Sequence, residues 1–71
     1  TGDDHLNYGH LLLSQGKVAE AVNEYAISAK ANINSFVSAF DADFSTLSNH
    51  GVTPEVAQLV KDAVVKIIHN T

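Results

Sequence analysis

The stretch HLNYGHLLLSQGKVAEAVNEYAIS, residues 5–28, decides the fold. Its apolar residues recur every three or four positions on both sides of Ser14-Gln15-Gly16, which is the spacing of a buried helical face. A glycine that follows a helical run readily takes the left-handed conformation that ends a helix. The stretch therefore predicts two helices, over about 3–14 and 17–31, joined by a tight turn at Gly16.

The second half of the chain shows the same alternation of helix and turn. Asn34 or Ser35 is a suitable N-cap for a helix that runs to about residue 48 and carries all three Phe residues on one stripe. Gly51 ends that helix, and Thr53-Pro54 places an N-cap before a proline at the first position of a last helix, over 54–69. No segment alternates polar and apolar residues with period two. The prediction is an all-α fold of four short antiparallel helices.

A loose internal repeat relates the two halves. Gly16 aligns with Gly51 at a separation of 35, and Tyr8 aligns with Phe40 at a separation of 32. Helix–turn–helix units with a period in the thirties are typical of helical solenoids. The four helices are therefore expected to form two stacked hairpins, over 3–31 and 34–69, within a single helical domain, residues 1–71.

The first hairpin resembles a tetratricopeptide repeat. The family pattern of aromatic, small and apolar residues is filled over about 3–30 by His5, Tyr8, Gly9, Leu12, Gly16, Ala21, Tyr25 and Ser28. Gly9 and Ala21 are small, so that the two helices can approach closely. His5 replaces the usual large aromatic residue, and Asp41 stands where the second unit needs a glycine. The second hairpin is thus interpreted as a degenerate or capping repeat.

The resemblance implies a right-handed solenoid fragment that serves as a non-catalytic protein-interaction or scaffold module. The positions of the family that face a ligand fall on both leading helices: Asp3, Leu6, His10, Leu13, Ser35, Ser38, Ala42 and Ser45. These side chains are small or mixed in character. They would suit a protein or peptide partner that carries basic or apolar groups.

Composition excludes several other classes of protein. The 71 residues hold no Cys and no Arg, and eight acidic against four basic side chains give a net charge of -4. Disulfide frameworks and thiolate zinc sites are excluded, and an acidic chain is a poor ligand for nucleic acid phosphates. No apolar run approaches the ~20 residues of a membrane span. We expect neither nucleic acid binding nor a membrane span.

The titratable residues offer no convincing catalytic or metal site. His5 and His10 are five positions apart and point in different directions, whereas a helical metal pair needs a spacing of four. His50 and His69 have no carboxylate at a suitable spacing, and the i,i+4 pair Glu20 and Glu24 is expected on a solvated face. The expectation is a protein that is not an enzyme and holds no metal or cofactor.

Two other functions stay open at this stage. The chain has about two units of a fold that normally stacks about three, and apolar residues lie off the main helical stripes, so a homo-oligomer of self-associating or capping modules is an alternative. The off-stripe residues are Leu11, Leu13, Ile27, Val65 and Ile68. A carrier or accessory domain is a distant third alternative, because Asp43-Phe44-Ser45-Thr46-Leu47 lacks the contiguous Asp-Ser-Leu of acyl carrier proteins.

Overall fold

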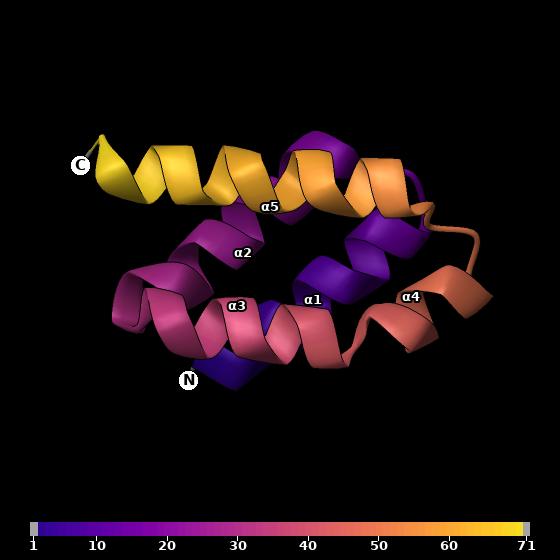
Figure 1. Ribbon diagram of the computed structural model, residues 1–71, viewed down its shortest axis with the longest axis horizontal. Helices are drawn as coiled ribbons and strands as arrows, with labels where there is room; N and C mark the ends of the chain where they lie inside the picture. The colour runs from indigo at the N-terminus through magenta and orange to yellow at the C-terminus, as the bar shows by residue number, and fades with distance from the viewer. Residues whose placement is uncertain (1, 71) are drawn as a thin grey trace.

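The computed structural model describes residues 2–70, with side chains from Asp4 to Asn70. Five helices follow one another along this part of the chain, and it contains no strand (Figure 1). The helices are α1 (Gly2–Ser14), α2 (Val18–Ala31), α3 (Ile33–Ala42), α4 (Phe44–Asn49) and α5 (Pro54–His69). The predicted all-α class is confirmed, with five helices in place of four.

The turn between α1 and α2 forms as the sequence predicts. Gly16 has φ +80°, in the left-handed region. The Gly16 N–H donates to the Leu13 carbonyl at 3.0 Å, and the Lys17 N–H donates to the Leu12 carbonyl at 2.9 Å. This pair of bonds is the Schellman motif, which satisfies carbonyls that the end of a helix leaves without partners.

The close approach of α1 and α2 depends on Gly9, as its small size predicts. A Cβ atom at this position would lie 2.6 Å from Cε1 of Tyr25 on the facing helix. Tyr25 and Ala21 are both fully buried. The aromatic ring therefore occupies the space that a side chain at position 9 would need.

The prediction of one continuous third helix is wrong, because the helix breaks at Asp43 into α3 and α4. Asp43 has φ -89° and ψ 1°, away from helical values. No glycine or proline lies near the break; instead, the Asp43 carboxylate is hydrogen-bonded to His10 of α1. The helix also begins earlier than predicted: the N-cap is Asn32, whose side chain accepts from the Ser35 N–H at 3.1 Å, and not Asn34 or Ser35.

The start of α5 agrees with the prediction. Gly51 has φ +90°, and the Val52 N–H donates to the Leu47 carbonyl at 3.1 Å, which repeats the Schellman geometry of the first turn. Thr53 Oγ1 then accepts from the Val56 N–H at 3.2 Å, and Pro54 takes the first helical position. Both glycine turns are thus set by local sequence.

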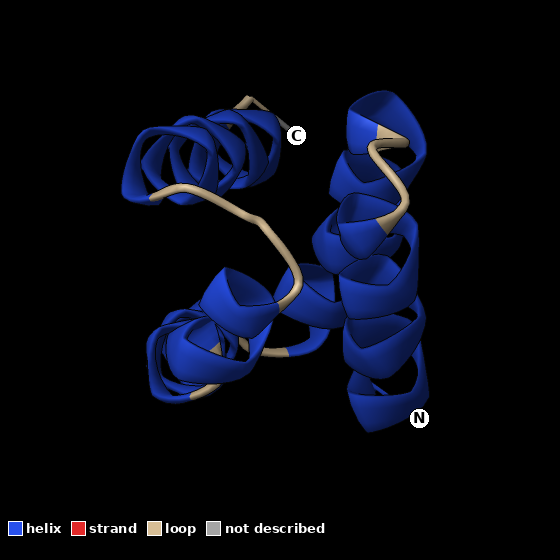
Figure 2. Ribbon diagram, turned by 90° about the vertical axis from the view of Figure 1, so that its right-hand side faces the viewer, coloured by secondary structure: helices blue, strands red, loops and turns tan. Residues whose placement is uncertain are grey.

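The helices form two layers, as Figures 1 and 2 show. The pair α1–α2 makes one layer, and α5 and the α3–α4 segment lie beside each other in the second. Helix α5 packs chiefly on α2 and makes only a small contact with α3. The second half of the chain is consequently an open pair of segments, both resting on the first hairpin.

A single apolar core lies between the two layers. Its largest fully buried side chains come from four of the five helices: Tyr25, Phe36, Phe40, Leu47, Val60 and Val64. Phe44, the third aromatic residue of the predicted stripe, is half-buried because it follows the break at Asp43. Leu13 is only 3% exposed, in contrast to its predicted place off the core face.

Candidate functional site

The residues expected to face a partner do not share one surface. Leu6 and Leu13 are 5% and 3% exposed and belong to the core. His10 is half-buried, whereas the α3–α4 positions are exposed: Ser35, Ser38, Ala42 and Ser45. The side chain of Asp3 lies outside the described residues. Leu6 and Leu13 can reach a partner only if the core opens, and the binding role of the other positions stays a prediction.

A network of side chains centred on His10 links three separate parts of the chain. His10 Nδ1 lies 2.7 Å from Tyr25 Oη, and His10 Nε2 lies 2.9 Å from Asp43 Oδ2. His10 belongs to α1, Tyr25 to α2, and Asp43 to the break between α3 and α4. The His10 side chain is 16% exposed and that of Asp43 is 44% exposed, so the network runs from the core to the surface.

The surroundings of Tyr25 define how protons are arranged in this network. Burial, together with the negative charge of Asp43, raises the pKa of the Tyr25 phenol well above its usual range. The phenol therefore keeps its proton, so its O–H is able to donate a hydrogen bond to His10 Nδ1, while a proton on Nε2 would donate to the Asp43 carboxylate. Both ring nitrogens are occupied by partners within the protein.

Aromatic rings hold the network in place. The ring centroids of His10 and Tyr25 are 5.5 Å apart, and those of His10 and Phe40 are 6.1 Å apart. Tyr25 also meets Phe40 edge to face, with centroids 5.3 Å apart and an interplanar angle of 86°. Such contacts favour one orientation of each ring. The imidazole is thus fixed by two hydrogen bonds and two aromatic neighbours.

A cleft lies between the α3–α4 segment and the first half of α5. It has a volume of about 240 Å³ and is lined by Phe40, Asp41, Phe44, Pro54, Ala57, Gln58 and Lys61. Ligand pockets for drug-sized molecules usually have ~300–1,000 Å³. The cleft is therefore suited to one or two amino-acid side chains. Its walls are mainly apolar.

The edge of the cleft is polar and carries an excess of negative charge. Lys61 Nζ donates to Asp41 Oδ1 at 2.9 Å across the cleft, and Gln58 Nε2 donates to Asp62 Oδ1 at 2.8 Å along α5. The Asp41 side chain is 56% exposed, whereas that of Lys61 is only 22% exposed. The carboxylates of Asp41 and Asp62 thus accompany one ammonium group at this edge.

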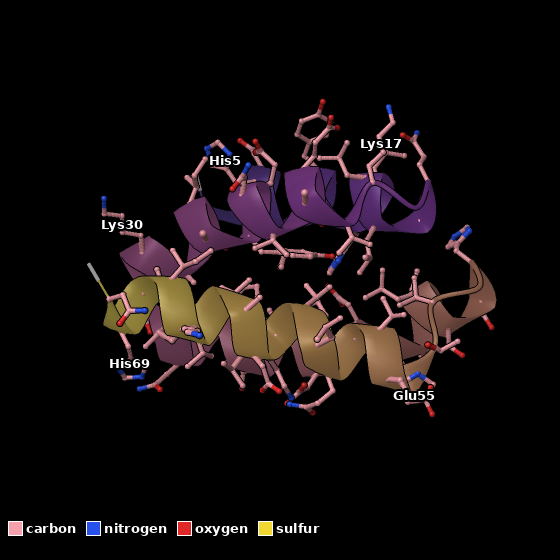
Figure 3. The ribbon with its side chains drawn as sticks, turned by 90° about the horizontal axis from the view of Figure 1, so that it is seen from above. His5, Lys17, Lys30, Glu55 and His69 are labelled. Atoms are coloured by element: carbon pink, nitrogen blue, oxygen red, sulfur yellow. The ribbon has the colours of Figure 1, made fainter. Side chains whose placement is uncertain are left out.

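Other charged side chains lie away from the cleft. His5 Nδ1 and Glu24 Oε1 are 2.8 Å apart and join α1 to α2. Figure 3 shows His5 and Lys17 on the side of the α1–α2 layer, with Glu55 pointing the opposite way from the first turn of α5. A second cavity, of about 220 Å³, lies between the two glycine turns, and His50 is the only titratable residue that lines it.

Sequence reasoning missed the His10 network because its members are far apart in the chain. Asp43 is 33 positions from His10, and Tyr25 is 15 positions from it. An argument from helical spacing considers only residues within a few turns of one helix, so the only partner considered for His10 was His5. It also missed the carboxylate partner of His5, which is Glu24 on the neighbouring helix. No local pattern in the sequence marks either pair.

Among residues 4–70, no group of three or more His, Asp or Glu side chains is placed to hold a metal ion. No helix in the described part of the chain is long and apolar enough to cross a membrane. The resemblance of the first hairpin to the tetratricopeptide repeat stays a prediction. No known protein family, curated protein or solved structure matches this chain.

Proposed function

We propose that this protein is a non-catalytic protein-interaction module that binds a helical peptide segment of a partner in the cleft between α3–α4 and α5. The segment would insert an apolar side chain between Phe44 and Ala57 and place basic side chains along the acidic edge. The observation that carries the proposal is the cleft itself, because apolar walls and an acidic edge occur together.

The size of the cleft supports a side-chain anchor. Burial of one Leu-sized side chain contributes about 1.5–3 kcal/mol, and an amphipathic helix in an apolar groove commonly uses two or more such anchors. Binding through one cleft of this size is accordingly expected in the micromolar to millimolar range. The exposed carboxylates add little affinity each, roughly 0.2–1 kcal/mol, but they select for basic partners and make binding sensitive to salt.

A binding role also suits the occupied state of His10. Both of its ring nitrogens have partners within the protein, which gives this residue a structural part in the proposal. The interaction and scaffold role implied by the tetratricopeptide resemblance belongs to the same class of function. A solenoid would need further helical units packed on the outer face of α1–α2. The proposal of peptide binding in the cleft does not depend on such units.

The experiment is a titration of the ¹⁵N-labelled protein with a 14-residue helical peptide that carries two Leu at i and i+4 among Lys residues. A control peptide has Glu in place of every Lys. We expect saturable shift changes at Phe44, Ala57 and Gln58 with the basic peptide, and weaker binding as salt rises. The proposal is wrong if neither peptide binds, if both bind equally, or if the changes lie on α1.

Two variants of the protein sharpen this experiment. Ala57→Leu fills the cleft and is expected to abolish the shift changes, because Ala57 lines it and is 7% exposed. Leu59→Ala is the matched control on the same helix, because Leu59 is 65% exposed and lies outside the cleft. Equal binding by the wild type and Ala57→Leu would contradict the cleft as the binding site.

Self-association is a second candidate, and the outer face of α1–α2 favours it. Tyr8 and Leu11 share a helical stripe and are 51% and 52% exposed, and Ile27 of α2 is 47% exposed. Sedimentation velocity from 10 to 500 µM would detect a homo-oligomer. We expect the Tyr8→Ser/Leu11→Ser variant to stay monomeric at concentrations where the wild type associates, and a monomeric wild type throughout would exclude this candidate.

A further inference from the structure

We infer that His10 is the positioning residue for the cleft: by holding Asp43 it maintains the break between α3 and α4 and thereby places the Phe44 wall. The expected effect of His10 on peptide affinity rests on the proposed binding function. The expected effect of His10 on the break between α3 and α4 concerns the unliganded protein alone.

His10 is linked to both aromatic side chains of the cleft, Phe40 and Phe44. Phe44 is the next residue after Asp43, whose carboxylate accepts from His10 Nε2 at 2.9 Å. Phe40 lines the same cleft and lies with its ring centroid 6.1 Å from that of His10. One imidazole therefore contacts one wall directly and fixes the other through a carboxylate.

The apolar spacing of the sequence by itself extends the third helix across the break. Residues 41–45 contain neither Gly nor Pro, and their spacing continues the aromatic stripe of the third helix. Asp43 nevertheless has ψ 1°, and its N–H bonds to the carbonyls of both Ala39 and Asp41. The hydrogen bond from α1 supplies the tertiary contact that opposes local preference. Without it, α3 and α4 can join, which turns Phe44 around the helix axis.

Tyr25 makes His10 a fixed support. The buried Tyr25 hydroxyl holds Nδ1 at 2.7 Å, which directs Nε2 towards Asp43. A ring held at one nitrogen by the core has little freedom at the other. An Nε2–H directed at Asp43 is the arrangement that the positioning role requires, and the ¹⁵N shifts of the two ring nitrogens report it directly.

The test compares His10→Leu with His10→Gln, whose amide keeps a donor near Asp43. In the unliganded protein, His10→Leu is expected to move the Cα shifts of residues 42–45 to continuous-helix values and to shift the Phe44 ring protons, and His10→Gln to restore both in part. His5→Leu is the matched control, because it removes the other imidazole–carboxylate pair of α1. It should leave residues 42–45 unchanged.

Peptide affinity provides the second readout. We expect His10→Leu to lower the affinity for the basic peptide about tenfold, because the Phe44 wall of the cleft is displaced. Asp43→Asn removes the charge at a half-exposed site and serves if His10→Leu does not fold; it should weaken the peptide in the same direction. Both substitutions remove the same hydrogen bond, so the double variant should lose no more peptide affinity than the stronger single variant. Additive losses of affinity would contradict the inference.

The outcomes separate the two proposals. If the wild type does not bind the peptide, the binding function is wrong, while the Cα shifts still decide whether His10 maintains the break. If the wild type binds and the shifts of residues 42–45 in His10→Leu and Asp43→Asn are unchanged from those of the wild type, the positioning role is wrong and the binding function stands.

Discussion

Substitution of Gly9 by Ala tests the close approach of α1 and α2. The added Cβ would lie 2.6 Å and 2.7 Å from Cε1 and Cδ1 of Tyr25, whereas ordinary contact begins at 3.4 Å. The ring has no room to retreat, because Tyr25 is fully buried, its hydroxyl is bonded to His10, and Phe36 lies 5.6 Å away between centroids. The backbones of the two helices must therefore move apart.

Two opposing contributions set the size of the effect. Overpacking of a core by one methyl group costs about 1–3 kcal/mol, and Ala is favoured over Gly inside a helix by about 0.5–1 kcal/mol. The expected net loss is about 1–2 kcal/mol in the free energy of unfolding. For a domain of this size each kcal/mol lowers Tm by about 4–8 °C.

Thermal and urea unfolding followed by circular dichroism would measure this loss. Asn7→Ala, at an exposed position of the same helix, is the control for helix propensity and should raise stability by a few tenths of a kcal/mol. Placing Gly9→Ala in a Tyr25→Leu background should remove most of its cost. A Gly9→Ala protein as stable as the wild type would refute the steric reasoning.

Three further substitutions are expected to lower stability for separate reasons. Tyr25→Phe removes the partner of His10 Nδ1 and should cost about 1–2 kcal/mol in urea unfolding at pH 7. The pKa of Tyr25 is raised in the folded protein, so the wild type should keep its stability below the ordinary phenol value of 10.0 and lose stability as the pH rises further. Tyr25→Phe should reduce this alkaline loss. An unchanged slope of the free energy of unfolding against pH would contradict the buried state of the phenol. Thr53→Ala should lower stability by about 1 kcal/mol through loss of the cap on α5, while Thr53→Ser should keep it. Gly51→Ala should cost about 1–2 kcal/mol from backbone conformation alone, since φ is +90° and no atom lies within 4 Å of the added Cβ; equal Tm values for wild type and variant would show that the turn tolerates Ala.

Local chemistry made the ends of most helices predictable. Gly16, Gly51 and Thr53-Pro54 act through bonds to residues three to five positions away, so a single sequence contains the information needed. The close packing of Gly9 was predictable for the same reason, since α1 and α2 are adjacent in the chain. These features place the first hairpin and the start of α5.

Long-range contacts account for what the sequence did not reveal. The break at Asp43 depends on an imidazole 33 positions away, and helical spacing alone extends the helix through it. Leu13 is buried because α1 is covered by α2 and also by the second layer, a consequence of tertiary packing. The cleft likewise depends on tertiary packing, because it lies between α3–α4 and an α5 helix that packs on α2 and not along α3.

The separate attachment of α5 and of α3–α4 to the first hairpin bears on how the molecule opens. Because each segment packs more closely on α2 than on the other segment, we expect either one to detach from α1–α2 while the other stays in place. Native-state hydrogen exchange should then resolve distinct opening free energies for the two segments, with the slowest amides in α2, on which both of them rest. Partial unfolding of this protein is then expected to follow two alternative routes, and the first hairpin stays folded in both.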